Sequence, residues 1–292
     1  MSENADPRTL HPSDGLDGTP QGQPGLTSET TPTPDHGESS YVGTGKLTRR
    51  RALITGGDSG IGRAVAIAFA REGADVAIVH LPEEEEDAAS TAKLITATGR
   101  RALLIPGDVR DERFCQQAVE LTVAEFGGLD VLVSNAAYQK SRESLECLET
   151  AEFERVFETN LYALLWFTKY ALPHLGAGAS IIVTTSIQAV SPAAELIDYA
   201  MTKAAQVAFV KAMAEELGAR GIRVNGVAPG PIWTPLIPAT DWPDKVAEFG
   251  KDTALGRPGQ PAELAPAYVL LASDDGSYMS GGVIAVTGGK PF

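Results

Sequence analysis

The sequence predicts an α/β fold with a single Rossmann-type, doubly wound parallel sheet and helices on both of its faces. Three observations lead to this prediction. From residue 46 onwards, short apolar runs alternate with amphipathic segments up to the C-terminus. The apolar runs are nearly continuous, as expected of strands that are buried on both faces. A glycine-rich turn follows the first run, which is typical of the first strand–helix junction in such sheets.

About seven strands are expected. The first covers residues 52–54, and apolar residues at helical spacing over 61–69 predict the following helix, which ends at Gly73. The acidic run at 83–87 begins the next helix, where acids interact favourably with the helix dipole. A long helix is expected over 153–170. The other strands are expected at 76–79, 102–105, 129–133, 180–184, 222–227 and 283–286.

Residues 46–292 therefore form one domain, and residues 1–45 form a separate N-terminal arm. The first 40 residues hold six prolines, five glycines and seven acidic residues against one arginine. Such a segment has too little apolar surface to offset the entropy lost on ordering. We expect a polar, largely disordered arm, with residues 1–25 disordered. For residues 26–46, an extended arm lying along a neighbouring subunit is the alternative.

Composition excludes several classes of partner. The net charge of −14 disfavours nucleic acid and anionic membrane surfaces, because a polyanion repels an acidic protein. No uninterrupted apolar run reaches the length of a membrane-spanning helix, and the acidic N-terminus lacks the order of a secretory signal. Cys115 and Cys147 have no metal-site spacing, so we expect two free thiols, no metal and a cytoplasmic location.

The glycine-rich turn contains Gly56, Gly60 and Gly62, spaced as G-x-x-x-G-x-G. Glycines between a strand and a helix let backbone amides approach a pyrophosphate, and the helix N-terminus adds favourable partial charge. The spacing differs from the G-x-G-x-x-G pattern of the two-half dinucleotide-binding enzymes. Tight packing without a ligand is the alternative explanation of this turn.

A second group of residues is suited to proton transfer. Lys203 lies one helical turn beyond Tyr199, and a nearby ammonium lowers the pKa of a phenol. Ser186 follows the fifth predicted strand, at the sheet edge where such folds bind ligands. Asn160 lies among apolar residues of the long helix, where it serves either a local helix bond or a polar relay.

The order and spacing of these motifs resemble the short-chain dehydrogenases/reductases from about residue 50 to the end. The Tyr41–Gly45 segment resembles bacterial oxidoreductases with a long N-terminal extension, a group that includes proteins described as general stress proteins. The matching motifs are Thr55-Gly56-x-x-x-Gly60-Ile61-Gly62, Asp108-Val109, Asn135-Ala136, Asn160, Ser186, Tyr199-x-x-x-Lys203 and Pro229-Gly230.

The resemblance implies a role for each motif. Ser186 would bind the substrate oxygen and Tyr199 would exchange a proton with it. Lys203 would lower the pKa of Tyr199 and bond the nicotinamide ribose, and Asn160 would hold a water that links Lys203 to solvent. The implied cofactor-binding residues are Gly56, Ser59, Gly60, Ile61, His80, Asp108, Val109, Asn135, Ala136, Tyr199, Lys203, Pro229, Gly230, Ile232 and Thr234.

The residues that follow the second strand bear on the choice of cofactor. A 2′-phosphate on the adenosine ribose needs Arg or Lys, whereas a free diol suits an acidic acceptor. No base stands at residues 80–83, and the acids nearby would repel a phosphate. The sequence therefore favours NAD(H), with NADP(H) as the alternative.

We expect an NAD(P)-dependent oxidoreductase that transfers a hydride between a nicotinamide cofactor and a small carbonyl or secondary alcohol. The alternative is a nucleotide-binding scaffold without turnover that senses stress or redox state. The resemblance implies a homo-oligomer, a tetramer. The substrate loop, residues 231–259, forms either a lid or a packed surface or interface element. The expected substrate-pocket residues are Tyr138, Gln188, Ala189, Trp233 and Leu236.

Overall fold

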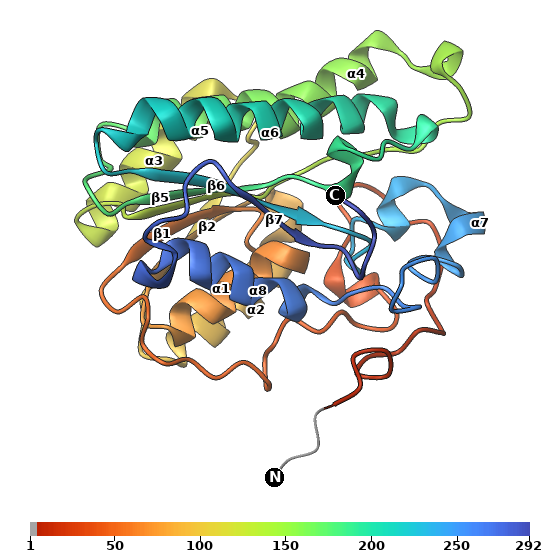
Figure 1. The fold of residues 1–292 in the computed structure, drawn as a ribbon, viewed down its shortest axis with the longest axis horizontal. Helices are drawn as coiled ribbons and strands as arrows, with labels where there is room; N and C mark the ends of the chain where they lie inside the picture. The colour runs from red at the N-terminus through yellow and green to blue at the C-terminus, as the bar shows by residue number, and fades with distance from the viewer. Residues whose placement is uncertain (1–4) are drawn as a thin grey trace.

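The computed structural model describes residues 5–292, apart from the side chains of residues 243 and 244, and it confirms the predicted sheet (Figure 1). Seven parallel strands lie in the order β3-β2-β1-β4-β5-β6-β7. The strands are β1 (Arg51–Thr55), β2 (Asp75–His80), β3 (Ala102–Pro106), β4 (Val131–Ser134), β5 (Ser180–Thr184), β6 (Arg223–Pro229) and β7 (Val283–Val286).

Helices cover both faces of the sheet. Helices α1, α2 and α8 pack on one face, and α3 to α6 pack on the other (Figure 1). The short helix α7 lies in the substrate loop, between β6 and α8. The bounds are α1 (Gly60–Arg71), α2 (Glu85–Thr96), α3 (Glu112–Phe126), α4 (Thr150–Phe157), α5 (Ala163–Ala171), α6 (Ile197–Gly218), α7 (Pro243–Val246) and α8 (Pro261–Ala272).

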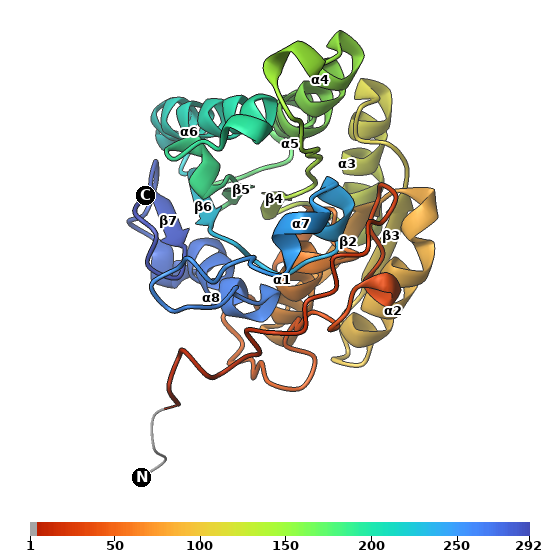
Figure 2. The same ribbon diagram turned by 90° about the vertical axis from the view of Figure 1, so that its right-hand side faces the viewer.

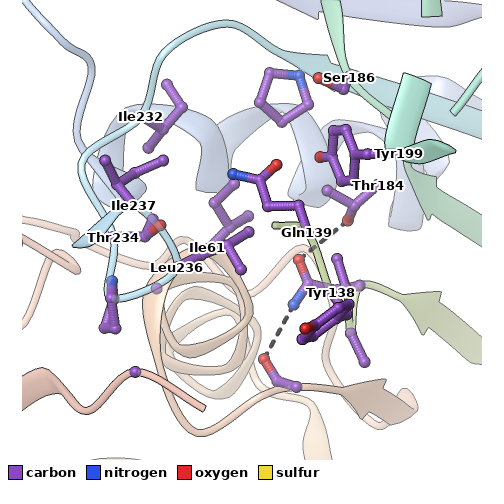
Figure 3. Close-up of a pocket in the computed structure, with 18 of the residues that line it drawn as sticks. Ile61, Tyr138, Gln139, Thr184, Ser186, Tyr199, Ile232, Thr234, Leu236 and Ile237 are labelled. Atoms are coloured by element: carbon purple, nitrogen blue, oxygen red, sulfur yellow. Dashed lines mark hydrogen bonds between the residues drawn. The ribbon is translucent and has the colours of Figure 1, made fainter. Parts of the chain in front are cut away.

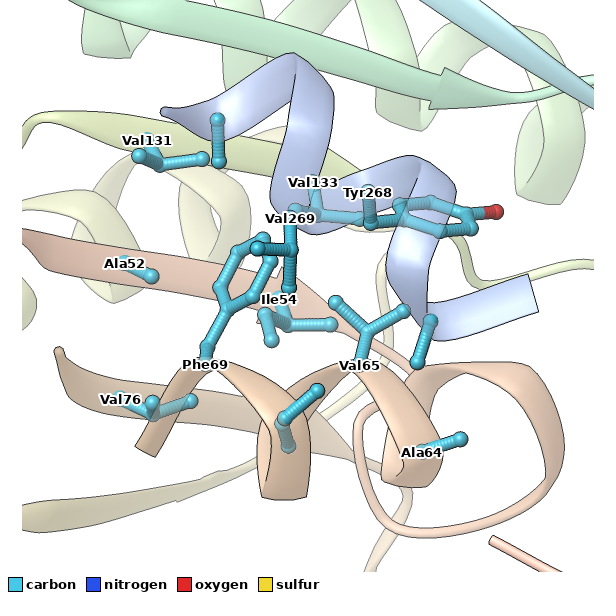
Figure 4. Close-up of a cluster of buried hydrophobic side chains, with 14 of the residues drawn as sticks. Ala52, Ile54, Ala64, Val65, Phe69, Val76, Val131, Val133, Tyr268 and Val269 are labelled. Atoms are coloured by element: carbon cyan, nitrogen blue, oxygen red, sulfur yellow. The ribbon is translucent and has the colours of Figure 1, made fainter. Parts of the chain in front are cut away.

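The apolar strands are buried on both sides because successive side chains point to opposite faces of the sheet. Leu53 and Ile54 of β1 are both fully buried, but they belong to different clusters. Ile54 packs in the cluster of Phe69 and Tyr268, between the sheet and helices α1 and α8 (Figure 4). Leu53 lies in the cluster of Phe167 on the other face. This double burial explains the continuous apolar runs in the sequence.

The helix predicted over 153–170 is not one regular helix. A π-helical turn, Glu158–Tyr162, joins α4 to α5. Asn160 lies in this turn, and its backbone carbonyl accepts a 2.6 Å hydrogen bond from the Gln206 side chain of α6. Such single π turns occur frequently at functional sites. The spacing of apolar residues in the sequence does not predict a single π-helical turn within a helix.

The N-terminal arm follows a defined path across its own domain from residue 5 onwards, which differs from the expected disorder (Figures 1 and 2). The indole Nε1 of Trp233 donates to the carbonyl of Pro32, and the amide of Ala262 donates to the carbonyl of Asp35. Composition predicts disorder because the arm has few apolar side chains of its own. The domain supplies the partners, mostly through hydrogen bonds to the backbone of the arm.

No helix within residues 5–292 combines the length and the apolar character needed to cross a membrane.

The glycine turn generates a prediction about stability. A methyl group on Gly62 would overlap the carbonyl oxygen of Gly56 and lie 2.7 Å from Nδ2 of Asn135. We expect Gly62→Ala to lower the free energy of unfolding by about 2 kcal/mol or more, because backbone must move to admit the methyl group. Gly218→Ala is the matched control, since nothing lies within 4 Å of its added methyl group. Equal stability of the two variants in urea unfolding would contradict this account of the turn.

Candidate active site

A cavity of about 800 Å³ opens at the carboxyl ends of the central strands. Its walls come from the glycine turn, the segments after β4 and β5, the start of α6 and the substrate loop. Figure 3 shows Ser186 and Tyr199 on one side of this cavity and Ile232, Thr234 and Ile237 on the other. Of the predicted catalytic and cofactor-binding residues, Asn160 does not line the cavity and all the others do.

The glycine turn forms one end of the cavity and fits a pyrophosphate. Gly56 and Gly60 have φ values of +62° and +48°, a left-handed conformation that favours glycine. Helix α1 begins at Gly60, and its N-cap residue Ser59 makes no side-chain capping bond. The first amides of a helix have no partner within the helix, so they can bind an anion here.

A buried hydrogen-bond network fixes the glycine turn to the centre of the sheet. The Asn135 side chain donates to the carbonyls of Thr55 and Gly56 at 3.2 and 3.0 Å. Its amide oxygen accepts a 3.1 Å bond from the Thr184 hydroxyl, which lies 2.7 Å from the hydroxyl of Tyr268 in α8. Sequence reasoning assigned no role to Thr184 or Tyr268. The run of three hydroxyl residues at 184–186 was the available signal.

Ser186, Tyr199 and Lys203 meet at the other end of the cavity. The Ser186 hydroxyl lies beside the Tyr199 phenol in the cavity wall (Figure 3). The Lys203 ammonium donates a 2.8 Å bond to the carbonyl of Thr184 and lies 5.2 Å from the centre of the Tyr199 ring. The Thr185 hydroxyl donates to the Lys203 carbonyl at 2.9 Å and so holds α6 against the end of β5. All three predicted side chains are buried.

Burial shifts the pKa values of both Tyr199 and Lys203. It raises the pKa of Tyr199 to about 12, although the neighbouring Ser186 hydroxyl opposes the rise. Burial also lowers the pKa of Lys203 to about 7. The sequence predicts that Lys203 lowers the pKa of Tyr199, but in the structure that pKa is raised. The reason is that both groups lie in a low-dielectric interior, which disfavours the charged form of each.

Asn160 holds the segment that follows β4. Its amide oxygen accepts from the Tyr138 backbone amide at 2.7 Å. Its amide nitrogen donates to the Tyr138 carbonyl at 2.9 Å and to the Thr202 hydroxyl at 3.2 Å. Within the described part of the chain, no hydrogen bond joins Asn160 to Lys203. The side chain thus supports the cavity wall, and the expected water relay stays a prediction.

The end of the cavity beyond the glycine turn is acidic. Asp58 is 1% exposed; its own backbone amide and the Ser59 side chain lie near its carboxylate, but neither forms a hydrogen bond of standard geometry with it. Burial raises the pKa of Asp58 to about 6, and burial with the charge of Asp58 raises that of Glu84 to about 8. A buried carboxylate suits a ligand with hydroxyl donors, such as a ribose diol. The sequence predicted acids in this region that would repel a phosphate, but not the burial of Asp58 and Glu84 in the cavity wall.

The expected substrate residues divide into two groups. Tyr138, Gln188 and Leu236 line the cavity, whereas Ala189 and Trp233 do not. Trp233 is fully buried in a cluster with Ile237. Neither the size of Trp233 nor the residues next to it in the sequence predict this structural role. Sequence reasoning also missed Gln139 and the arm residues 23–25, which line the cavity.

Three kinds of comparison bear on this site. Residues 56–290 match the family model described as enoyl-(acyl carrier protein) reductase. An uncharacterized oxidoreductase of Bacillus subtilis, YhdF, is 55% identical over 92% of each chain. General stress protein 39 of the same organism is 53% identical, over 92% of this chain and 93% of its own.

An NADPH-dependent aldehyde reductase of Arabidopsis thaliana is 44% identical, over 91% of this chain and 95% of its own. The crystal structure of a short chain dehydrogenase from Burkholderia cenocepacia in complex with NADP superposes with a TM-score of 0.79. It is 35% identical and covers 84% of this chain and 98% of its own.

The buried Lys203 predicts a pH-dependent contribution to stability. Its pKa is about 7 in the folded protein, against the usual 10.5. Between these values the unfolded chain binds more protons, so the unfavourable contribution of Lys203 is complete below pH 7 and disappears as the pH rises. We expect any stability gained by Lys203→Met to be largest near about pH 6 and to shrink toward about pH 10. Urea unfolding of both proteins across this range measures it, and a constant difference would contradict the burial argument.

Proposed function

Because the chain belongs to the short-chain dehydrogenase/reductase family, we propose that it transfers a hydride between a nicotinamide dinucleotide and the carbonyl carbon of an aldehyde or ketone. The reverse reaction oxidises the corresponding alcohol. One observation carries this proposal: Ser186, Tyr199 and Lys203 share a single cavity with the glycine turn. A binder without turnover would need only the turn.

The residues divide the chemistry between them. A bound nicotinamide dinucleotide would supply or accept the hydride. Ser186 donates a hydrogen bond to the substrate oxygen and so orients the carbonyl. Tyr199 donates its phenolic proton to that oxygen during reduction. A pKa of about 12 keeps the phenol protonated at neutral pH, which suits its role as the general acid.

Lys203 completes the proton transfer. Loss of the phenolic proton leaves a buried phenolate, which an adjacent ammonium stabilises. A pKa of about 7 lets Lys203 carry this charge and also release a proton to restore the phenol. Its bond to the Thr184 carbonyl holds the ammonium close to the ring.

Two observations bear on the choice between NAD(H) and NADP(H), and they favour different cofactors. The relatives whose cofactor is named use NADP or NADPH, so they give no support to NAD(H). The adenosine end of this cavity, however, is lined by Asp58 and Glu84, and no Arg or Lys lies next to them in sequence. We retain NAD(H) as the proposal because a buried carboxylate accepts from a diol and repels a phosphate.

We also propose association into a homotetramer. Large apolar side chains are exposed on the helices of one face: Leu121 on α3, Leu165 on α5, and Ile197 and Met201 on α6. Their burial between subunits would remove apolar surface from water.

The catalytic proposal predicts that Tyr199→Phe lowers kcat by a factor of about 10²–10⁴, because the proton donor is lost. The dissociation constant of the dinucleotide should change little. Tyr278→Phe is the control, since Tyr278 is fully exposed. Absorbance assays with a panel of aldehydes, ketones and alcohols measure the rates. Near-normal turnover in Tyr199→Phe would refute the assignment, and a wild-type protein that binds a dinucleotide but turns over nothing would favour the scaffold.

The cofactor proposal predicts that the wild-type protein binds NADH more tightly than NADPH. Asp58→Asn removes the carboxylate charge with little change of shape. We expect this variant to gain affinity for NADPH relative to NADH by about tenfold. Fluorescence titration at about pH 8, where Asp58 with a pKa of about 6 is ionised, measures both constants. Tighter binding of NADPH by the wild-type protein would overturn the preference.

A further inference from the structure

The N-terminal arm reaches the cavity, although it lies far from the site in sequence. Gln23, Pro24 and Gly25 line the same cavity as Gly60 and Tyr199. In Figure 2 the arm, drawn in red, runs past α7 toward the start of α2. This path crosses the carboxyl edge of the sheet, where the dinucleotide is proposed to bind.

The side chain of Gln23 ties two walls of the cavity together. Its amide nitrogen donates a 2.7 Å bond to the carbonyl of Ala239 in the substrate loop. The same nitrogen donates a 3.2 Å bond to the carbonyl of Gln139, in the segment after β4. Gln139 in turn donates a 2.7 Å bond to the Thr240 hydroxyl. The arm, the loop and the segment after β4 are thus held by one connected set of bonds.

Gly25 brings the backbone of the arm directly onto the substrate loop. A methyl group on Gly25 would overlap the carbonyl of Pro235 and lie 3.1 Å from Cβ of Ala239. Below this layer, a methyl group on Gly60 would lie 3.2 Å from Thr234. The arm therefore covers the part of the loop that itself covers the glycine turn.

The arm is also anchored on the far side of the cleft. The backbone amide of Thr27 donates a 2.9 Å bond to the carboxylate of Asp87, in the first turn of α2. The amide of Gln21 donates a 3.3 Å bond to the carbonyl of Pro238 in the substrate loop. Residues 21–27 thus span from the loop to the helix that follows β2.

We propose that residues 21–27 form a strap across the dinucleotide cleft, with Gln23, Pro24 and Gly25 as part of the cofactor-binding wall. The strap holds the substrate loop over the pyrophosphate end, so release of the dinucleotide requires the Gln23 bonds to open. This inference rests on the proposed function only in needing a nicotinamide dinucleotide as the ligand. It makes Gln23 a positioning residue that acts through the loop.

The test measures the dissociation rate of NADH and NADPH from the full-length protein by stopped-flow fluorescence with a displacing excess of the oxidised form. Gln23→Met keeps the length of the side chain and removes both donated bonds. Gln23→Glu also places a carboxylate against the two carbonyl oxygens. We expect both variants to release the dinucleotide about tenfold faster, as the loss of two hydrogen bonds predicts. Ser28→Ala, at an exposed position in the same arm, should leave the rate unchanged.

Hydrogen exchange on the wild-type protein provides a second measurement that needs no variant. A strap predicts that added NADH or NADPH slows exchange at the amides of Gln21 and Thr27 and in the substrate loop. Unchanged dissociation rates in both Gln23 variants, or unchanged exchange in the arm when the dinucleotide is bound, would overturn the strap alone. A protein that binds neither dinucleotide would overturn the proposed function and the strap together.

Discussion

The close packing of Gly62 against the carbonyl of Gly56 is the constraint on which the site depends. It sets the start of α1 directly at the end of β1 and leaves the first amides of the helix facing the cavity. The Asn135 side chain holds the same carbonyl and connects it to Thr184. Thr184 in turn accepts from the Lys203 ammonium through its backbone. The glycine turn and Lys203 are thus joined by one buried network, so the core fixes their relative positions.

Burial shifts the pKa values of Tyr199 and Lys203 in opposite directions. A lysine held in the interior has a lowered pKa, and a tyrosine held there has a raised one. Each shift follows from desolvation of the charged form. The outcome is a phenol that keeps its proton beside an amine that can exchange one near neutral pH. This arrangement favours proton donation from Tyr199 in the proposed reaction.

The arm shows how a segment without a core of its own gains a defined path. Trp233, which was expected in the substrate pocket, instead packs beneath the arm and donates to the carbonyl of Pro32. Gln23 and Gly25 make their contacts with the substrate loop, so the arm and the loop order one another. The cavity wall is therefore built from segments more than 200 residues apart.

The sequence by itself determined the fold, because apolar runs of strand length record burial on both faces of a sheet. It also predicted the site motifs, because the spacing of the glycines and of Tyr199 and Lys203 is a local feature of the chain. Only the tertiary structure decided the partners of those residues. The buried Asp58, the link from Thr184 to Tyr268, the π turn at Asn160 and the placement of Gln23 all depend on contacts between distant segments. Burial likewise reversed the expected direction of the Tyr199 pKa, because local spacing supplies the neighbouring ammonium but does not specify how far water is excluded from both groups.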